Sequence, residues 1–428
     1  MSARSRSLLF GLSLASVILV GSTMRSPIVG LSGVLERIVA DLNLSALVAG
    51  SLTTIPVLAF AVCTPIAAYL IRRTGYKFCI SLTLLGVALG IVVRSIGSTP
   101  LVILGTALIG LAITLGNVTM PVLIRARFTL SQRAVATALY TTALNMGAML
   151  MLLTVVPLAN ALGWRWALGL WAAHSLIALA VWMTTVGVSD ALRVTHPART
   201  PVAATAAAGD EPAQPIEVVR EASDAMVGTD PTDPAYRKDL RFRLVIMTIA
   251  FGFQSFGYYS VTAWLPQILG AKAGLAAESA SSAASVFQMT AVIGAFGIPL
   301  LARRVKYSHL ALGLATMWIT FALGMLGATS LWGIWLVLGG AAQGGTFTLI
   351  MILMVQLAKN DAEAAKFSAT IQGIAYTVAA LGPTLLGFAF DKTGSWDAPL
   401  YLVLGAISVL AVTLFLTTRD SAHIRYKK

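Results

Sequence analysis

The stretch LLFGLSLASVILVGSTMRSPIVGLSGVL, from Leu8 to Leu35, decides what kind of protein this chain forms. It is almost wholly aliphatic and small, and its one charged side chain is Arg25. The hydrocarbon core of a bilayer is about 30 Å thick, and ~20 apolar helical residues cross it. At ~1.5 Å per residue from Leu8, Arg25 would lie roughly 26 Å along such a helix, in the far half of that core. The stretch predicts a first membrane span that contains a cation.

Arg25 admits two interpretations. If one helix covers the whole stretch, the guanidinium lies in the apolar zone, where a charge is costly unless it faces water or an anion. Such residues mark substrate pathways. If the helix ends near Thr23, Arg25 can extend to the surface and Pro27 opens a loop. Residues 28–35 continue without charge, which favours the first interpretation.

The composition of the whole chain indicates an integral membrane protein. Of its 428 residues, 57% are hydrophobic and 11% are charged, and the mean hydropathy is +0.83. A soluble globule needs more polar surface than this. The two cysteines, Cys63 and Cys79, lie in apolar stretches, so the sequence predicts no disulfide framework, no metal site and no cofactor.

Twelve apolar stretches are long enough to span a membrane. They come as six, a gap and six: residues 8–33, 46–71, 78–97, 100–124, 134–158, 164–188, 242–269, 280–302, 308–328, 331–358, 367–390 and 397–418. The gap is rich in proline, alanine and acidic residues, which predicts a flexible linker. We therefore expect an all-α membrane protein with an amino-terminal six-helix bundle (1–188), a cytoplasmic linker (189–240) and a carboxyl-terminal six-helix bundle with a cytoplasmic tail (241–428).

The placement of lysine and arginine predicts the orientation. With the amino terminus in the cytoplasm, 24 of the 30 basic residues lie inside, Arg25 lies in the membrane, and five lie outside: Arg37, Arg94, Arg165, Lys272 and Lys392. The positive-inside rule then places both termini and the linker on the cytoplasmic side of a plasma (inner) membrane. The net charge of +13 is explained by this asymmetry and by lipid headgroups, so no nucleic-acid partner is expected.

The chain carries an internal repeat. A shift of 231 residues aligns Arg72 and Arg73 with Arg303 and Arg304, Leu44 with Leu275, Ala138 with Ala369, Gly163 with Gly394, and Arg25 with Phe256. One constant offset at separated places indicates two parallel repeats of six spans. In such proteins the substrate binds between the repeats near the midplane, and the repeats rock to alternate access.

Residues 68–77, AYLIRRTGYK, follow the second span and resemble the loop motif of the major facilitator superfamily, Gly-x-x-x-Asp-Arg-x-Gly-Arg-Lys. Arg73, Gly75 and Lys77 match it, whereas Ala68 and Arg72 stand where Gly and Asp are expected. The resemblance implies a major facilitator fold. It also implies a conformational role for this loop and its repeat, residues Arg72, Arg73, Gly75, Lys77, Arg303 and Arg304.

Three further segments resemble the cyanate and 2-nitroimidazole transporter family. They are Met24-Arg25 with residues 44–56 (LSALVAGSLTTIP), Gly116-Asn117-Val118 with Pro121 and Arg125, and residues 263–266 (AWLP) with 285–288 (SVFQ). Ser26 departs from that family's frequent proline, and residues 125–128 (RARF) depart from its Lys-Arg-Asp-Phe-like stretch. The resemblance implies a secondary transporter for a small molecule that works as a monomer in the lipid bilayer.

The spans restrict the chemistry that the protein can perform. Every Asp and Glu falls in a loop, a span end, the linker or the tail. Proton-coupled transporters commonly carry an intramembrane carboxylate, so its absence argues against a proton-coupled exporter of cationic drugs. An uncompensated arginine favours an anionic or electron-rich substrate instead.

The superfamily resemblance implies that spans one, four, seven and ten, with parts of two, five, eight and eleven, line the substrate cavity. Our predicted substrate-binding residues there are Arg25, Asn117, Tyr258, Gln288 and Trp264. Weaker candidates are Tyr140, Asn145, Gln254, Tyr259, Gln343, Gln372 and Tyr376. For each, the alternative is an interhelical hydrogen bond or an aromatic side chain at the membrane interface. For His174 we favour packing over a proton relay, and for Asp391 an ordinary span-end charge over a gate.

The sequence thus predicts a secondary transporter that moves a small anion or a small polar aromatic compound, similar to cyanate or a nitroimidazole, by alternating access. A multidrug or xenobiotic exporter of the same fold is the alternative. A polytopic membrane enzyme would need clustered His, Asp or Glu near one face, and the spans contain no such cluster. We therefore expect a carrier rather than an enzyme.

Overall fold

The computed structural model describes residues 3–194, 234–357 and 361–419, and within these ranges the chain is helical without a strand. The amino-terminal group of helices consists of α1 (Ala3–Thr23), α2 (Ser26–Leu42), α3 (Ala46–Thr74), α4 (Tyr76–Ser95), α5 (Thr99–Arg127), α6 (Leu130–Gly169), α7 (Trp171–Val186) and α8 (Val188–Leu192). The carboxyl-terminal group consists of α11 (Pro234–Ala273), α12 (Ala277–Leu301), α13 (Tyr307–Gly327), the 3₁₀ turn η2 (Thr329–Leu331), α14 (Trp332–Gln356), α15 (Asp361–Thr393) and α16 (Asp397–Thr418).

The predicted set of membrane spans is confirmed. Eleven helical segments of the described residues are long and apolar enough to cross a membrane, and the shorter apolar helix α7 completes the twelve. The first of these segments, Gly11–Leu42, comprises α1 and α2. Between the fifth and sixth spans the chain turns at Gly163, whose φ of 80° lies in a region that glycine adopts without steric cost. The sixth span therefore begins within α6.

Helices occupy both ends of the predicted linker. Residues 189–192 belong to α8 and residues 234–240 to α11, although both ranges fall inside the predicted linker 189–240. Hydropathy marks where a helix enters the membrane; α11 begins before that point with polar residues, and α8 is a short separate helix that follows Gly187. The rest of the predicted linker, from 195 to 233, lies outside the described residues.

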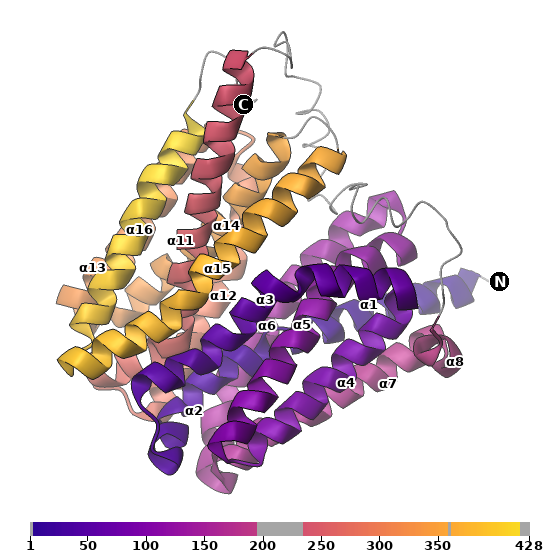
Figure 1. The fold of residues 1–428 in the computed structure, drawn as a ribbon, viewed down its shortest axis with the longest axis horizontal. Helices are drawn as coiled ribbons and strands as arrows, with labels where there is room; N and C mark the ends of the chain where they lie inside the picture. Colours follow the sequence, from indigo (N-terminus) through magenta and orange to yellow (C-terminus); the bar gives the residue numbers. More distant parts are fainter. Residues whose placement is uncertain (1–2, 195–233, 358–360, 420–428) are drawn as a thin grey trace.

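The two groups of helices lie side by side (Figure 1). In the first group α4 packs against α5 and α7, and α2 packs along α6; in the second, α12 packs along α14 and α11 along α16. Two helix pairs join the groups, because α3 lies along α15 and α6 lies along α12. The repeat makes these pairs equivalent: spans two and five of the first half correspond to spans eight and eleven of the second.

Hydrogen bonds between α3 and α15 join the groups at the end remote from the start of α1 and α11. Both carboxylate oxygens of Asp391 accept hydrogen bonds from backbone nitrogens at the start of α3, at 3.0 Å from Ala46 and 2.9 Å from Leu47. Further along the pair, Thr54 Oγ1 donates to the Ala380 carbonyl at 2.6 Å. A carboxylate at a helix amino terminus is stabilised by the free N–H groups there. Asp391 thus links the two groups.

The second pair of helices, together with α2 and α11, adds contacts at the same end. Gln267 on α11 donates through Nε2 to the Ser32 carbonyl on α2 at 2.7 Å. Ser281 on α12 donates through Oγ to the Leu152 carbonyl on α6, also at 2.7 Å. Ser32, Gln267 and Ser281 are buried. We call this region, where α2, α3 and α6 meet α11, α12 and α15, the closed end.

Candidate functional site

The span that carries Arg25 is broken at that residue. α1 ends at Thr23, α2 begins at Ser26, and Arg25 between them has φ −120° and ψ −31°. Pro27 has no N–H, so the Thr23 carbonyl loses its helical partner. The hydroxyls of Ser22, Thr23 and Ser26 bond nearby backbone carbonyls, which competes with helical hydrogen bonds. Each interpretation of the sequence was therefore partly right: one helix does end at Thr23, but another begins at once and no loop forms.

Arg25 points between the two groups of helices rather than toward the surface. Its Nη1 donates a hydrogen bond to Oδ1 of Asn145 on α6 at 2.7 Å. Its Cζ lies 5.0 Å from the ring centroid of Tyr258 on α11. Asn145 and Tyr258 are buried, while Arg25 keeps partial exposure. In the part of the chain that the structure describes, no carboxylate forms an ion pair with Arg25.

A row of aromatic side chains begins at this cation. The ring of Tyr258 lies over Arg25, the rings of Tyr259 and Tyr376 continue from it, and Tyr140 lies beside Gly21, about one helical turn before Arg25. The rings of Tyr258 and Tyr259 lie 5.0 Å apart and those of Tyr259 and Tyr376 lie 6.5 Å apart, each pair edge to face. The negative face of an aromatic ring attracts a cation without neutralising it. These rings therefore do not replace a carboxylate as a counter-ion.

Two further predicted residues lie next to these tyrosines. Asn117 on α5 accepts a hydrogen bond from the Tyr140 hydroxyl at 3.1 Å, and it is half-buried. Gln288 on α12 is buried; its Oε1 lies 3.4 Å from the Tyr258 hydroxyl and its Nε2 lies 3.4 Å from Thr262 Oγ1. These two contacts are long for hydrogen bonds. The structure thus joins three predicted residues, Arg25, Tyr258 and Gln288, by direct contacts, and it places Asn117 against Tyr140.

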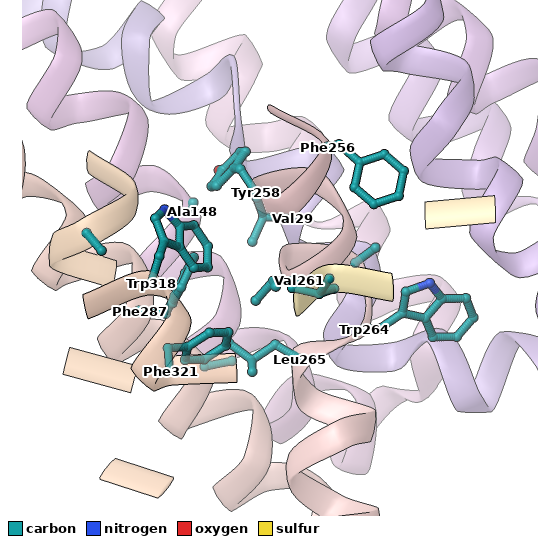
Figure 2. Packing of buried hydrophobic residues seen from close by; sticks show 14 of the residues in the cluster. Val29, Ala148, Phe256, Tyr258, Val261, Trp264, Leu265, Phe287, Trp318 and Phe321 are labelled. Atoms are coloured by element: carbon teal, nitrogen blue, oxygen red, sulfur yellow. The ribbon is translucent and has the colours of Figure 1, made fainter. Parts of the chain in front are cut away.

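Trp264 is not brought to this group. It lies six residues beyond Tyr258 on α11, which is ~9 Å along the helix axis. Its Nε1 donates to the Pro383 carbonyl on α15 at 2.8 Å, and its ring packs 5.2 Å from that of Trp396. Figure 2 shows Trp264 on the same side of α11 as Phe256, away from Phe287, Trp318 and Phe321. The indole therefore packs at the closed end.

The predicted loop motif lies at the opposite end of the molecule from these contacts. Gly75 has φ 83° and ψ 154°, a conformation that residues with a Cβ rarely adopt. Lys77 forms an ion pair with Asp190 of α8 at 2.6 Å, and this hydrogen bond holds the pKa of Asp190 below its usual value. Arg72, Arg73, Arg303 and Arg304 are exposed, and Arg73 lies over the Tyr69 ring. Their conformational role remains a prediction.

Sequence reasoning undervalued three residues. Asn145 ranked among the weaker candidates, yet it is the hydrogen-bond partner of Arg25. His174 Nε2 lies 2.8 Å from Ser22 Oγ beside the helix break, a contact that no sequence pattern indicates. Arg94 was counted among the basic residues on the outer side, at the end of the predicted span 78–97; it lies in the last turn of α4, and its side chain is buried. Each depends on how helices are rotated against one another, which hydropathy does not report.

Comparison with known proteins places the fold and the site in context. The sequence profile of the Major Facilitator Superfamily matches residues 12–376. The chain belongs to this superfamily. A D-xylose–proton symporter of known structure aligns with a TM-score of 0.75 over 97% of this chain and 99% of the symporter. At 13% identity that likeness shows the shared fold alone. The predicted architecture of twelve spans in two bundles is the major facilitator fold.

Three relatives are named as transporters. The transporter YycB of Bacillus subtilis is 30% identical over 93% of this chain and 91% of its own length. The 2-nitroimidazole transporter of Escherichia coli is 30% identical over 94% of this chain and 93% of its own length. The cyanate transport protein CynX of Escherichia coli is 24% identical over 96% and 97% of the two chains. The chain is a multi-pass membrane transporter of this kind.

Proposed function

We propose that this transporter carries a small anion or a small polar aromatic compound, and that Arg25 recognises it. The observation that carries the proposal is the guanidinium at the break between α1 and α2. It contacts one neutral amide and one aromatic face, and it has no carboxylate partner among the described residues. A cation held at membrane depth without an acid is costly, and a site for an anion accounts for that cost.

The surrounding side chains support a small and planar substrate. A guanidinium presents donors in one plane that match two acceptor atoms of an anion. Tyrosine rings offer flat faces for stacking and hydroxyls for hydrogen bonds. The amino terminus of α2, beside Arg25, adds a favourable partial charge for an anion. Cyanate and 2-nitroimidazole, which two relatives are named for, both fit this chemistry.

Alternating access follows from the arrangement of the two groups. We propose an inner-membrane protein with both termini in the cytoplasm, so that the closed end faces outward. The contacts of Asp391, Gln267 and Ser281 would then break when the site opens to the outside. We further propose that the protein works as a monomer without a cofactor and transports its substrate unchanged, as its relatives' names imply for them.

The experiment that tests this proposal is a flux measurement on purified protein in liposomes. The panel contains cyanate, nitrite, small carboxylates and nitroimidazoles, each with and without a pH gradient. We expect saturable flux of at least one member and competition between that member and the other anions. Flux confined to bulky apolar drugs, with a matching resistance phenotype in an overexpressing strain, would contradict the proposal and favour an exporter.

A further inference from the structure

Arg94, like Arg25, is an arginine without an acidic partner among the described residues. It lies in the last turn of α4, and its side chain is 1% exposed. Its Nη1 donates a hydrogen bond to the Pro27 carbonyl at 2.7 Å, whereas Nε and Nη2 have no hydrogen-bond partner. No ion pair to Arg94 is found among the described residues. Burying a guanidinium with two of its nitrogens unpartnered is unfavourable, so the contact to Pro27 requires an explanation.

The acceptor of this hydrogen bond belongs to the first turn of α2. Pro27 follows Arg25 by two residues, and Arg25 is the residue from which α2 starts. The backbone at this point lacks the helical hydrogen bond that a residue other than proline would supply. The bond from Arg94 therefore fixes a segment whose own backbone bonding is incomplete.

The base from which Arg94 extends is rigid. α4 and α5 cross closely at Gly105, where an added Cβ would lie only 2.7 Å from the Cα of Arg94. On the other side of the break, α6 approaches closely at Gly147, where an added Cβ would lie 2.8 Å from the Cα of Ser22. Interfaces of small residues let membrane helices pack at such short range. The end of α1 is thus held by α6, and the start of α2 is held by the side chain of Arg94.

We propose that Arg94 is a positioning residue for substrate recognition. Its hydrogen bond to the Pro27 carbonyl holds the first turn of α2 at the break, and this keeps the Arg25 guanidinium between Asn145 and the ring of Tyr258. The consequence for substrate affinity rests on the proposed function of Arg25. The consequence for the backbone does not, because the first turn of α2 should loosen without Arg94 whatever the protein carries.

The first arm of the test measures the backbone directly. Ser26→Cys, introduced with Cys63→Ser and Cys79→Ser, places a thiol at a position that is 1% exposed in the native side chain. We expect Arg94→Met and Arg94→Gln to raise the rate at which a water-soluble thiosulfonate labels this thiol by about tenfold. A tenfold rise corresponds to a loss of ~1.4 kcal/mol in the free energy that keeps the first turn of α2 inaccessible. Arg94→Lys, which keeps a charged donor, should stay within about threefold of the parent.

Arg165→Met is the matched control. Arg165 is in the same group of helices, donates to the Gly97 carbonyl just beyond α4 at 3.3 Å, and pairs with Asp41 at the far end of α2 at 2.7 Å. Arg165→Met makes the same change of side chain as Arg94→Met, but Arg165 does not contact the break. The labelling rate at position 26 should therefore not change. Arg94→Met and Arg94→Gln both remove the buried charge, and two neutral side chains of different polarity guard against a failure of either one to fold. Parental labelling rates in the folded Arg94 variants would overturn the proposal.

The second arm measures flux of radiolabelled cyanate in liposomes. We expect Arg94→Met or Arg94→Gln to raise KM about tenfold while the maximal rate stays within about twofold, with Arg94→Lys close to wild type. A general structural defect would lower the maximal rate and the amount of folded protein instead. If Arg25→Ala leaves flux intact, the proposed function fails, yet the labelling arm still decides the role of Arg94. If labelling rises and KM does not, Arg94 is not a positioning residue for the substrate.

Discussion

The first span of each half shows how two repeats of one fold have diverged. In the amino-terminal half the span breaks into α1 and α2 at Arg25, whereas in the carboxyl-terminal half α11 runs unbroken from Pro234 to Ala273. The offset of 231 residues aligns Arg25 with Phe256 and Pro27 with Tyr258. The half with the proline presents a cation, and the half with the tyrosine presents an aromatic face. One repeat therefore supplies the charge beside the break, and the other supplies an aromatic surface that shapes the space around it.

Proline alone does not explain the break. α11 continues as a helix through Pro266, which lies inside it and is buried. Near Pro27, the hydroxyls of Ser22, Thr23 and Ser26 bond the carbonyls of Leu19, Val20 and Ser22, and Arg94 bonds the carbonyl of Pro27 itself. Membrane helices tolerate proline when neighbouring groups form hydrogen bonds with the backbone, and such groups can also stabilise a break between two helices. A break at membrane depth is therefore a property of the surroundings as well as of the residue.

Removing the cation should have the largest effect. We expect Arg25→Ala to reduce substrate flux by about 100-fold or more, because a hydrogen bond to a charged group contributes about 1.5–3 kcal/mol and long-range attraction is lost with it. Arg25→Lys keeps the charge but loses the planar fork, so it should retain more flux than alanine. The measurement is initial flux at matched amounts of inserted protein, with Arg165→Ala as the control.

Closing the break should have the next largest effect. Pro27→Ala restores an N–H that can bond the Thr23 carbonyl, which favours a continuous helix and turns Arg25 away from Asn145. We expect KM to rise about tenfold, whereas Pro266→Ala in α11 should change it by less than about twofold. An unchanged KM in Pro27→Ala would show that hydroxyls and helix contacts hold the break without the proline.

Changing the aromatic face in the other half should have a moderate effect. Tyr258→Leu removes the ring that lies over Arg25, and a partly buried cation–π contact is worth about 0.5–2 kcal/mol. We expect KM to rise about threefold to tenfold. Tyr258→Phe keeps the ring and loses a contact of 3.4 Å to Gln288, so its KM should lie nearer to wild type. Equal losses in the two variants would mean that the hydroxyl, and not the ring, matters.

Trp264 gives the smallest expected effect on affinity. Trp264→Phe removes the hydrogen bond to the Pro383 carbonyl at the closed end, 2.8 Å long, and keeps an aromatic ring there. We expect KM to change by less than about twofold, while the rate of conformational exchange, measured as counterflow, shifts more strongly. A tenfold rise in KM without a change in exchange would return Trp264 to the substrate site, as the sequence resemblance implies.

Sequence patterns reveal the fold well and the site in part. Twelve spans and a repeat follow from hydropathy and spacing, because membrane solvation acts on each segment separately. Arg25 can be recognised for the same reason, because a charge inside an apolar stretch is visible in the sequence without knowledge of its contacts. Asn145 and Arg94 do not stand out, because their roles depend on a partner 120 or 67 residues away and on the rotation of two helices. Trp264 is the opposite case, because its motif predicts a substrate-binding residue whereas its contacts to Pro383 and Trp396 lie at the closed end.

Equilibrium binding of a radiolabelled anion to the purified protein tests the central claim most directly, because it separates recognition from movement. Cyanate is measured first, with the wild-type protein, Arg25→Ala and the control Arg165→Ala at equal folded concentration. The account predicts saturable binding to the wild type and the control, and a Kd at least about 100-fold weaker for Arg25→Ala, which corresponds to ~2.7 kcal/mol. Equal binding by wild type and Arg25→Ala would contradict it.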